Sequence, residues 1–222
     1  MRFLQTLLFG TAMLLTFSSC AQKAKKQSTT SKNISSKKDL SRYSQATFAA
    51  GCFWHEEAIF ESVKGVQEAI SGYSGGTIKN PTYQNHGEGA KSHAETVNVY
   101  YDSSVITYPT LLKIYFAAQD PTSPNGQAPD FGPQYRSVLF YRNNTEKQLA
   151  ENYMKQLSAS GKYKKPLAVQ VVPFTKFWEA EDYHQDYIKH NPNQGYVRAV
   201  SIPEIKKFQK EYPQLIKAGY VY

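Results

Sequence analysis

Apolar positions divide the chain into three parts. Residues 3–17 are mostly apolar, residues 21–46 are almost entirely polar, and from residue 47 onward apolar and polar residues recur at short, regular spacings. Such spacings are typical of helices and strands that bury one face, so residues 47–222 are predicted to form the single folded domain. Residues 21–46 have too few apolar side chains to form a core and are predicted to be a disordered basic linker.

Within residues 47–222 the pattern predicts alternating strands and helices. Strands are predicted at residues 47–50, 65–70, 93–101, 136–141 and 167–172, and helices at residues 52–63, 108–118, 145–160 (N-cap Thr145) and 180–189. Prolines and glycines mark residues 120–133 as a loop, and residues 193–222 hold weak elements at most. This order predicts an α+β fold, a two-layer plait with a ferredoxin-like split βαβ core and a C-terminal extension of irregular structure.

The apolar run at the start has the parts of an export signal. Arg2 supplies the positive charge, the apolar run of fifteen residues is too short to span a membrane, and small residues precede Cys20. The sequence of residues 17–20 is similar to a bacterial lipobox, so residues 1–20 are predicted to be a lipoprotein signal peptide with lipidated Cys20 as the first mature residue. A plain secretory signal is the alternative. Lipidation predicts a membrane-anchored protein of the bacterial cell envelope, on the periplasmic or outer-membrane side.

The positive charge of the chain belongs to its tail. Residues 1–46 carry eight Lys+Arg and one Asp, a net charge of +7, whereas residues 47–222 carry eighteen Lys+Arg and seventeen Asp+Glu, a net charge of +1. A folded domain so close to neutrality gives no reason to expect nucleic-acid binding. The basic tail suits an anionic membrane surface, with simple solvation as the alternative.

Cys52 is the candidate nucleophile, because the other cysteine, Cys20, lies in the signal. Cys52 follows Gly51 where a strand meets a helix, and the amide groups of a helix N-terminus favour a thiolate. The alternative is a buried cysteine that acts as a small apolar residue. His55, one turn further on, could pair with Cys52 in a hydrolase or lie on a solvated helix face. Two such ligands do not make a zinc site, so no metal is predicted.

An acid and two aromatic residues are further candidates. Glu95 shares a strand face with Val97 and Val99, where desolvation raises the pKa of a carboxyl and makes it a possible proton donor. The alternative is that Glu95 lies at the end of the strand and its side chain faces the solvent. The adjacent residues Phe53 and Trp54 face different ways on a helix, so one is available to wall a pocket while the other packs in the core.

Three loop residues complete the set of candidates. Tyr83 follows a glycine-rich turn, and Asp130 and Tyr135 lie in and beside the loop rich in proline and glycine. Loops of this kind often carry site residues, although each of the three taken singly is also explained as loop filler.

Seven blocks of residues together resemble a known family. They are Gly51-Cys52-Phe53-Trp54 with Glu57, Ser71-Gly72-Tyr73-Ser74-Gly75-Gly76, Pro81-Thr82-Tyr83, His93-Ala94-Glu95, Asp120-Pro121-Thr122, Gln134-Tyr135-Arg136-Ser137 and Ala180-Glu181-Asp182-Tyr183-His184-Gln185. Over residues 47–195 their order and spacing resemble those of the A-class peptide methionine sulfoxide reductases.

The resemblance implies an enzyme that reduces methionine S-sulfoxide, free or in oxidised proteins, without a metal or organic cofactor. It implies that Cys52 attacks the sulfoxide sulfur and that Glu95 protonates the sulfoxide oxygen, which leaves methionine and a sulfenic acid on Cys52. The resemblance assigns the remaining candidates as follows: Tyr83 and Tyr135 as hydroxyl donors to that oxygen, Asp130 as the loop acid of the polar side, and Phe53 and Trp54 as the walls that seat the methyl group. The competing interpretations are a Cys-His hydrolase or acyltransferase and a non-catalytic surface lipoprotein.

The chain also departs from the family. His55 and Glu56 stand where glycine and a small apolar residue are usual, and residues 86–92 differ from the usual sequence. Many relatives carry resolving cysteines near the C-terminus, whereas here no cysteine follows Cys52. The sulfenic acid is therefore expected to be reduced by an external thiol, from a thioredoxin- or glutaredoxin-like protein or a small molecule, with an unlipidated Cys20 as the alternative. The protein is expected to be a monomer.

Overall fold

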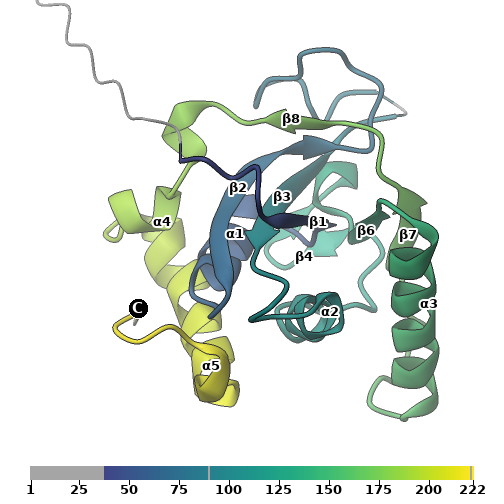
Figure 1. The fold of residues 1–222 in the computed structure, drawn as a ribbon. Coiled ribbons are helices and arrows are strands. Elements are labelled where there is room, and N and C mark those ends of the chain that lie inside the picture. Colours follow the sequence, from purple (N-terminus) through teal and green to yellow (C-terminus); the bar gives the residue numbers. More distant parts are fainter. Residues whose placement is uncertain (1–37, 90, 221) are drawn as a thin grey trace, which may run out of the picture. The chain divides into compact units, whose positions relative to one another are not determined.

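A six-stranded sheet of order β7-β6-β1-β3-β2-β8 is the centre of the fold in the computed structural model (Figure 1). The structure describes residues 38–89, 91–220 and 222. The predicted signal peptide, the lipidation site Cys20 and most of the predicted linker lie outside these residues.

The sheet is mixed but mostly antiparallel. Its strands are β1 (Ser44–Ala49), β2 (Val66–Ser74), β3 (Ala94–Tyr101), β6 (Val138–Tyr141), β7 (Gln170–Pro173) and β8 (Phe177–Glu179). Only β6 and β7 pair in parallel. The short strands β4 (Gly126–Gln127) and β5 (Asp130–Phe131) form a separate antiparallel pair.

The helices are α1 (Phe53–Glu61), α2 (Tyr108–Ala117), α3 (Asn144–Ala159), α4 (Tyr187–His190) and α5 (Ile202–Glu211). Short 3₁₀ turns span Pro133–Tyr135, Asp182–His184 and Pro213–Leu215, and a π turn spans Val197–Ser201. The expected mixture of helices and strands is confirmed.

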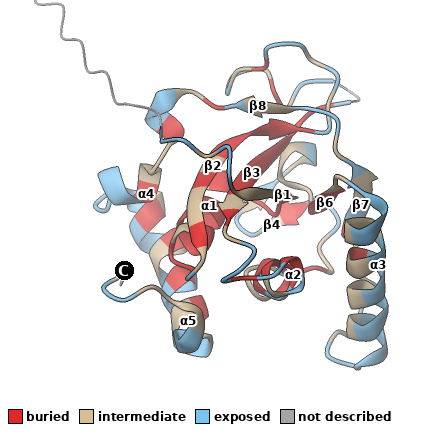
Figure 2. Cartoon of the chain, in the orientation of Figure 1, coloured by how far each residue is buried: buried red, intermediate tan, exposed pale blue. Residues whose placement is uncertain are grey.

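Aromatic packing joins the central strands to the helices. Phe48 of β1 is fully buried, and its ring lies 5.2 Å from the ring of Phe60 in α1 and 5.4 Å from that of Tyr115 in α2. Figure 2 shows the red, buried positions concentrated on the central strands and the inner sides of these helices. These contacts remove large apolar surfaces from water and fix where α1 begins relative to the sheet.

The opposite side of the central strands is buried too, and it combines a small apolar cluster with a polar network. Thr47 donates a hydrogen bond to Asn98 Oδ1 at 2.8 Å, and Arg142 Nη2 donates to the same oxygen at 2.9 Å. The prediction of a single buried, apolar face for residues 93–101 is therefore incomplete, because hydrogen bonds allow the polar face of β3 to be buried too.

The structure corrects several predicted boundaries. Strand β1 begins at Ser44, three residues before the expected start of the domain at residue 47, and the N-cap of α3 is Asn143 rather than Thr145. Strand β2 continues to Ser74, four residues beyond the strand end predicted at residue 70 and into the glycine-rich segment predicted to be a turn. Gly72 fits there because a Cβ would lie only 2.3 Å from the carbonyl oxygen of Trp178, so the glycine permits the close pairing with β8.

The C-terminal part differs from the prediction in two places: a predicted helix is interrupted, and a helix forms where little regular structure was expected. The predicted helix over residues 180–189 is broken, because Asp186 takes a left-handed conformation with φ 52° between a 3₁₀ turn and α4. Residues 193–222, in contrast, contain the ten-residue helix α5, so the expectation of an irregular extension is wrong. Ile205 and Phe208, spaced one turn apart, are the buried side of α5.

In the part of the chain with described coordinates, no helix combines the length and the apolar character needed to cross a membrane.

Replacing Ile205 with alanine tests whether α5 is part of the folded core. Ile205 is fully buried, so we expect the change to lower the free energy of unfolding by about 2–5 kcal/mol in urea denaturation. The exposed neighbour Lys206 provides the matched control, and Lys206→Ala should change that free energy by less than about 0.5 kcal/mol. Equal, small effects of both changes would show that α5 is only loosely attached.

Candidate active site

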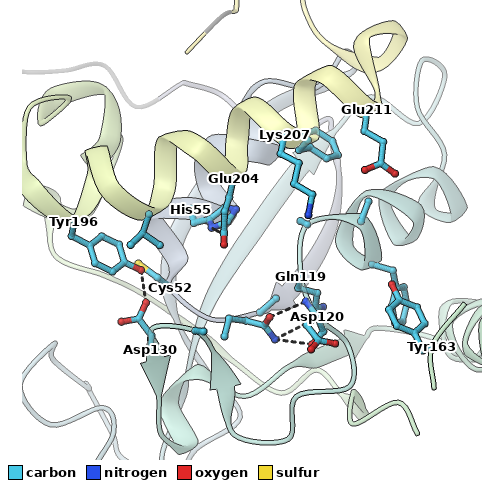
Figure 3. A pocket seen from close by; sticks show the side chains of 18 of the residues that line it. Cys52, His55, Gln119, Asp120, Asp130, Tyr163, Tyr196, Glu204, Lys207 and Glu211 are labelled. Atoms are coloured by element: carbon cyan, nitrogen blue, oxygen red, sulfur yellow. Dashed lines mark hydrogen bonds and ion pairs between the residues drawn. The ribbon is translucent and has the colours of Figure 1, made fainter. Parts of the chain in front are cut away.

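Cys52 lies at the junction of β1 and α1. Gly51 makes the turn with φ 82°, a value that favours glycine, and Cys52 is the N-cap residue of α1. The Cys52 side chain is partly exposed and lines a cavity of about 500 Å³. Figure 3 shows its sulfur beside Tyr196 and Asp130, with His55 and Glu204 further along the same cavity. A ligand that enters this cavity can therefore reach the thiol.

The surroundings of Cys52 favour the neutral thiol over the thiolate. Burial raises the pKa of Cys52 well above its usual value, and the charges of Glu95 and Asp130 raise it further. The backbone N–H groups of Trp54 and His55 at the head of α1 lower it, as the helix start predicts, but they do not prevail. The expectation of a resting thiolate is therefore wrong for the unliganded protein.

Glu95 is the buried acid of the site. It lies in β3 with only 2% of its surface exposed, and burial raises its pKa to about 8. The backbone N–H of Phe53, the first residue of α1, donates a hydrogen bond to Glu95 Oε2 at 3.0 Å, which opposes this rise. The carboxyl group is therefore neutral at pH 7 and is held at the helix end that carries Cys52.

The three loop candidates join the same group. Tyr83 lies after β2, Asp130 lies in β5, and Tyr135 ends the 3₁₀ turn at Pro133–Tyr135. Burial raises the pKa of Tyr83 to about 12, and the charges of Glu95, Cys52 and Asp130 add to the rise. Burial and the charge of Glu95 likewise raise the pKa of Tyr135. Both phenols therefore keep their protons and can act as hydrogen-bond donors near the acid and the thiol.

The two aromatic candidates face different ways. Phe53 is 1% exposed, and its ring packs 5.9 Å from the ring of Tyr73 and 5.0 Å from that of His184. Trp54 is partly exposed and stacks on Tyr187 with ring centres 3.7 Å apart. Its indole N–H donates to His184 Nδ1 at 3.0 Å, which fixes the orientation of the ring. Phe53 thus belongs to the core behind the site, and Trp54 presents a fixed aromatic surface.

Two residues of the site were not among the candidates. The hydroxyl of Tyr196 donates a hydrogen bond to Asp130 Oδ2 and lies beside the Cys52 sulfur, as Figure 3 shows. Glu181 accepts the backbone N–H of Tyr83 at 3.0 Å and the hydroxyl of Tyr73 at 2.9 Å, so it fixes the loop that carries Tyr83. Tyr196 is one of 17 tyrosines and no local pattern marks it, whereas Glu181 lies in a block of the family signature.

The contacts of the His55 ring do not support a role as the base of Cys52. Its Nδ1 lies 3.0 Å from Glu204 Oε2 of α5, and its Nε2 has no hydrogen-bond partner among the described residues. The neighbouring Glu56 is buried, and neither of its carboxyl oxygens has a hydrogen-bond partner among the described residues. Burial raises the pKa of Glu56 well above the usual value. Residues 38–89, 91–220 and 222 contain no group of three His, Cys, Asp or Glu arranged to hold a metal ion.

Similar proteins have been characterised by sequence and by structure. A sequence model described as peptide methionine sulfoxide reductase matches residues 44–216. The peptide methionine sulfoxide reductase MsrA 1 of Rhodopirellula baltica is 44% identical over 174 residues, which cover 78% of this chain and 90% of that protein. The MsrA protein of Sulfolobus acidocaldarius is 45% identical over 168 residues, 76% of this chain and 94% of that protein.

Two solved structures have a similar fold. The reduced form of Mxr1 from Saccharomyces cerevisiae has a TM-score of 0.65 and 30% identity, covering 71% of this chain and 91% of that one. Methionine sulfoxide reductase A of Corynebacterium diphtheriae has a TM-score of 0.60 and 30% identity, covering 68% and 76%.

The class of protein that these matches define is an oxidoreductase that acts on sulfoxides. The chain belongs to the peptide methionine sulfoxide reductase family. The hydrolase and the non-catalytic lipoprotein are not favoured.

Replacing His55 with alanine separates the reductase from the Cys-His hydrolase. Because the ring of His55 contacts the half-exposed Glu204, loss of the ring should lower the rate of methionine sulfoxide reduction by less than about fivefold. A general base would instead contribute about 10²–10⁴-fold to the rate. A loss of that size in single-turnover assays would therefore support a mechanism that uses a Cys-His pair.

Proposed function

We propose that the protein reduces methionine S-sulfoxide by direct attack of the Cys52 sulfur on the sulfoxide sulfur. The observation that carries this proposal is the meeting of a partly exposed thiol and a buried, neutral carboxyl at the head of α1. A sulfoxide is a poor electrophile until its oxygen accepts a proton, and Glu95 is the group that supplies it.

The reaction balances with one thiol and one sulfoxide. As the Cys52 sulfur bonds to the substrate sulfur, Glu95 donates its proton to the sulfoxide oxygen. The oxygen then passes to the Cys52 sulfur as its bond to the substrate breaks, which leaves methionine and a sulfenic acid. The thiol is oxidised, the sulfoxide is reduced, and the proton that the thiol loses replaces the one that Glu95 gave.

The remaining site residues stabilise and position the substrate. Tyr83 and Tyr135 donate hydrogen bonds to the sulfoxide oxygen as its charge develops, since their raised pKa values keep both phenols protonated. Asp130 and Tyr196 form the polar side next to the sulfur. The surface of Trp54, with Phe53 behind it, seats the methyl group of the substrate.

An external thiol completes the cycle in this proposal. Cys52 is the only cysteine between residues 21 and 222, so a resolving cysteine from the folded part is absent from the sequence itself. A thioredoxin- or glutaredoxin-like protein, or a small thiol, attacks the sulfenic sulfur and then releases Cys52 by a second thiol exchange.

Replacing Glu95 with glutamine tests the acid. Glutamine keeps the shape and the acceptor for the Phe53 N–H but has no proton to give, so we expect the single-turnover rate of methionine formation to fall by about 10²–10⁴-fold. In the parent protein the rate should also fall above about pH 8, because the acid form of Glu95 is lost as pH rises through its raised pKa. An unchanged rate in the variant would rule out this role.

Cys52→Ser is the matching control for the nucleophile. It should form no methionine and no trappable sulfenic acid, while the parent without reductant forms one equivalent of each. Addition of thioredoxin or of a small dithiol to the parent should convert this single turnover into continuous turnover. Full activity of Cys52→Ser would refute the proposal.

We also propose that the domain is anchored to the bacterial cell envelope through a lipid on Cys20, with residues 1–20 removed and a basic linker before the fold. The lipobox-like residues and the concentration of positive charge in residues 1–46 support this. A monomer is proposed with it, and sedimentation of the domain is its test.

The mass of the mature N-terminus tests the anchor. Expression of the full chain in a bacterium that processes lipoproteins should yield a protein that begins at Cys20, carries acyl chains and partitions into the membrane fraction. Cys20→Ser should remain unprocessed or lack the lipid mass. If the mature protein carried no acyl mass, the lipid anchor would be ruled out and the plain secretory signal would be the remaining interpretation.

We further infer that the core is a ferredoxin-like plait. The strands β6-β1-β3-β2 are antiparallel neighbours, and the chain order β1-α1-β2-β3-α2-β6 has the split βαβ connection, which supports this assignment. A high-resolution crystal structure in which this strand order differs would overturn it.

A further inference from the structure

His86 is a buried histidine that the reaction described above does not use. It lies in residues 86–92, the segment that departs from the family's usual sequence, and is 5% exposed. Its ring stacks on Tyr73, with ring centres 4.6 Å apart, and on Tyr83 at 5.6 Å. Its backbone is held as well, because its N–H donates to Thr82 at 2.9 Å and its carbonyl accepts from His93 at 2.8 Å. The ring is therefore fixed in position.

The hydrogen bonds of His86 determine which nitrogen carries the proton. Nδ1 lies 2.9 Å from the backbone carbonyl oxygen of Tyr83, which can only accept, so Nδ1 is the donor. In the neutral ring Nε2 then has a free lone pair. Nε2 lies 3.6 Å from Glu95 Oε1 and has no hydrogen-bond partner within the described ranges. A buried proton acceptor thus faces the buried acid.

This arrangement answers a difficulty in the proposed reaction. At neutral pH both the Cys52 thiol and the Glu95 carboxyl hold their protons. Attack requires a thiolate, yet Glu95 must stay protonated to serve as the acid, so a third group has to hold the thiol's proton. Tyr83 and Tyr135 are donors that keep their own protons, which leaves Asp130, solvent or His86.

We propose that His86 is a positioning residue of the reductive step, whose Nε2 holds the thiol's proton through Glu95. Glu95 passes its proton to Nε2 and takes up the proton of Cys52, so the thiolate, the neutral acid and an imidazolium are present together. When Glu95 then protonates the sulfoxide oxygen, the proton on Nε2 returns to Glu95. The net products remain methionine and the sulfenic acid, and no further reactant is consumed. This inference rests on the function proposed above.

The groups around the pair are consistent with a neutral His86 that can accept a proton. Five titratable groups lie around His86: Tyr73, Tyr83, Glu181, His93 and His184. Besides His86, five lie around Glu95: Cys52, Tyr73, Tyr83, Asp130 and Tyr135. Burial lowers the pKa of His86, and the carbonyl groups of Tyr83 and Thr82 partly oppose this. Glu181, on the far side, favours the imidazolium once it forms.

The proposal predicts a distinct pH profile. If the proton stays inside the protein, the reactive state holds as many protons as the resting state. The single-turnover rate of the parent should therefore be flat from about pH 6, near the ordinary pKa of histidine, to about pH 8, where Glu95 ionises. Without the acceptor the thiol must lose its proton to water, and the rate should rise about tenfold per pH unit over the same range.

His86→Gln and His86→Phe are the test variants, assayed with a methionine S-sulfoxide peptide and no reductant. Glutamine keeps polar contacts but takes up no proton, and phenylalanine keeps the stacking on Tyr73 and Tyr83. Both should be about a hundredfold slower than the parent near pH 6, approach it near pH 8, and bind the peptide with an unchanged dissociation constant. His190→Gln, at an exposed position of α4, is the matched control and should keep the flat profile.

The outcomes separate the two proposals. A parent that forms no methionine would sink the proposed function itself. A parent that reacts, with a folded His86→Gln variant whose profile stays flat, would overturn the role of His86. A uniform loss at every pH, rather than a change of slope, would assign His86 to structure alone. Circular dichroism of both variants checks that the fold is intact.

Discussion

The hydrogen bond between the backbone N–H of Phe53 and the carboxyl of Glu95 links the parts of the site. It joins the first turn of α1 to β3, and it holds a desolvated acid at the helix end that begins with Cys52. The aromatic stack of Phe48 and Phe60 fixes α1 on the sheet, so the acid and the sulfur cannot drift apart. Burial, which keeps this acid neutral, also keeps the thiol neutral, and the chemistry has to resolve that conflict.

Residues 180–211 contribute side chains that complete the site. Glu181 holds the loop of Tyr83, His184 orients Trp54, and Tyr196 hydrogen-bonds to Asp130 beside the thiol. Helix α5 then closes one side of the cavity, with Glu204 on His55. No cysteine lies in this part, so its contribution to the site is positional.

Sequence patterns predicted much of the fold where one side of an element is apolar. The strand predicted at residues 93–101 and the helix predicted at residues 108–118 each agree with β3 and α2 to within one residue at either end. Prediction failed where distant contacts override local preference. Gly72 continues β2 because β8 approaches its backbone closely, and Asp186 breaks a helical pattern while its N–H donates to Glu57. Residues 202–208, where most of α5 lies, were predicted only as a weak element, because three lysines and a proline outnumber the two buried residues of this helix.

The sequence by itself determined the family, the single cysteine of the folded part and the acid on an apolar strand face, because these depend on residue identity and spacing. Only the tertiary structure decided the protonation states of the site residues and which side chains they contact. The helix start predicted a thiolate at Cys52, but burial beside Glu95 and Asp130 reverses that preference. His55, next to the sulfur in sequence, turns to α5, whereas His86, 34 positions away, faces the acid. Desolvation and through-space contact set these properties, and neither is a function of local sequence.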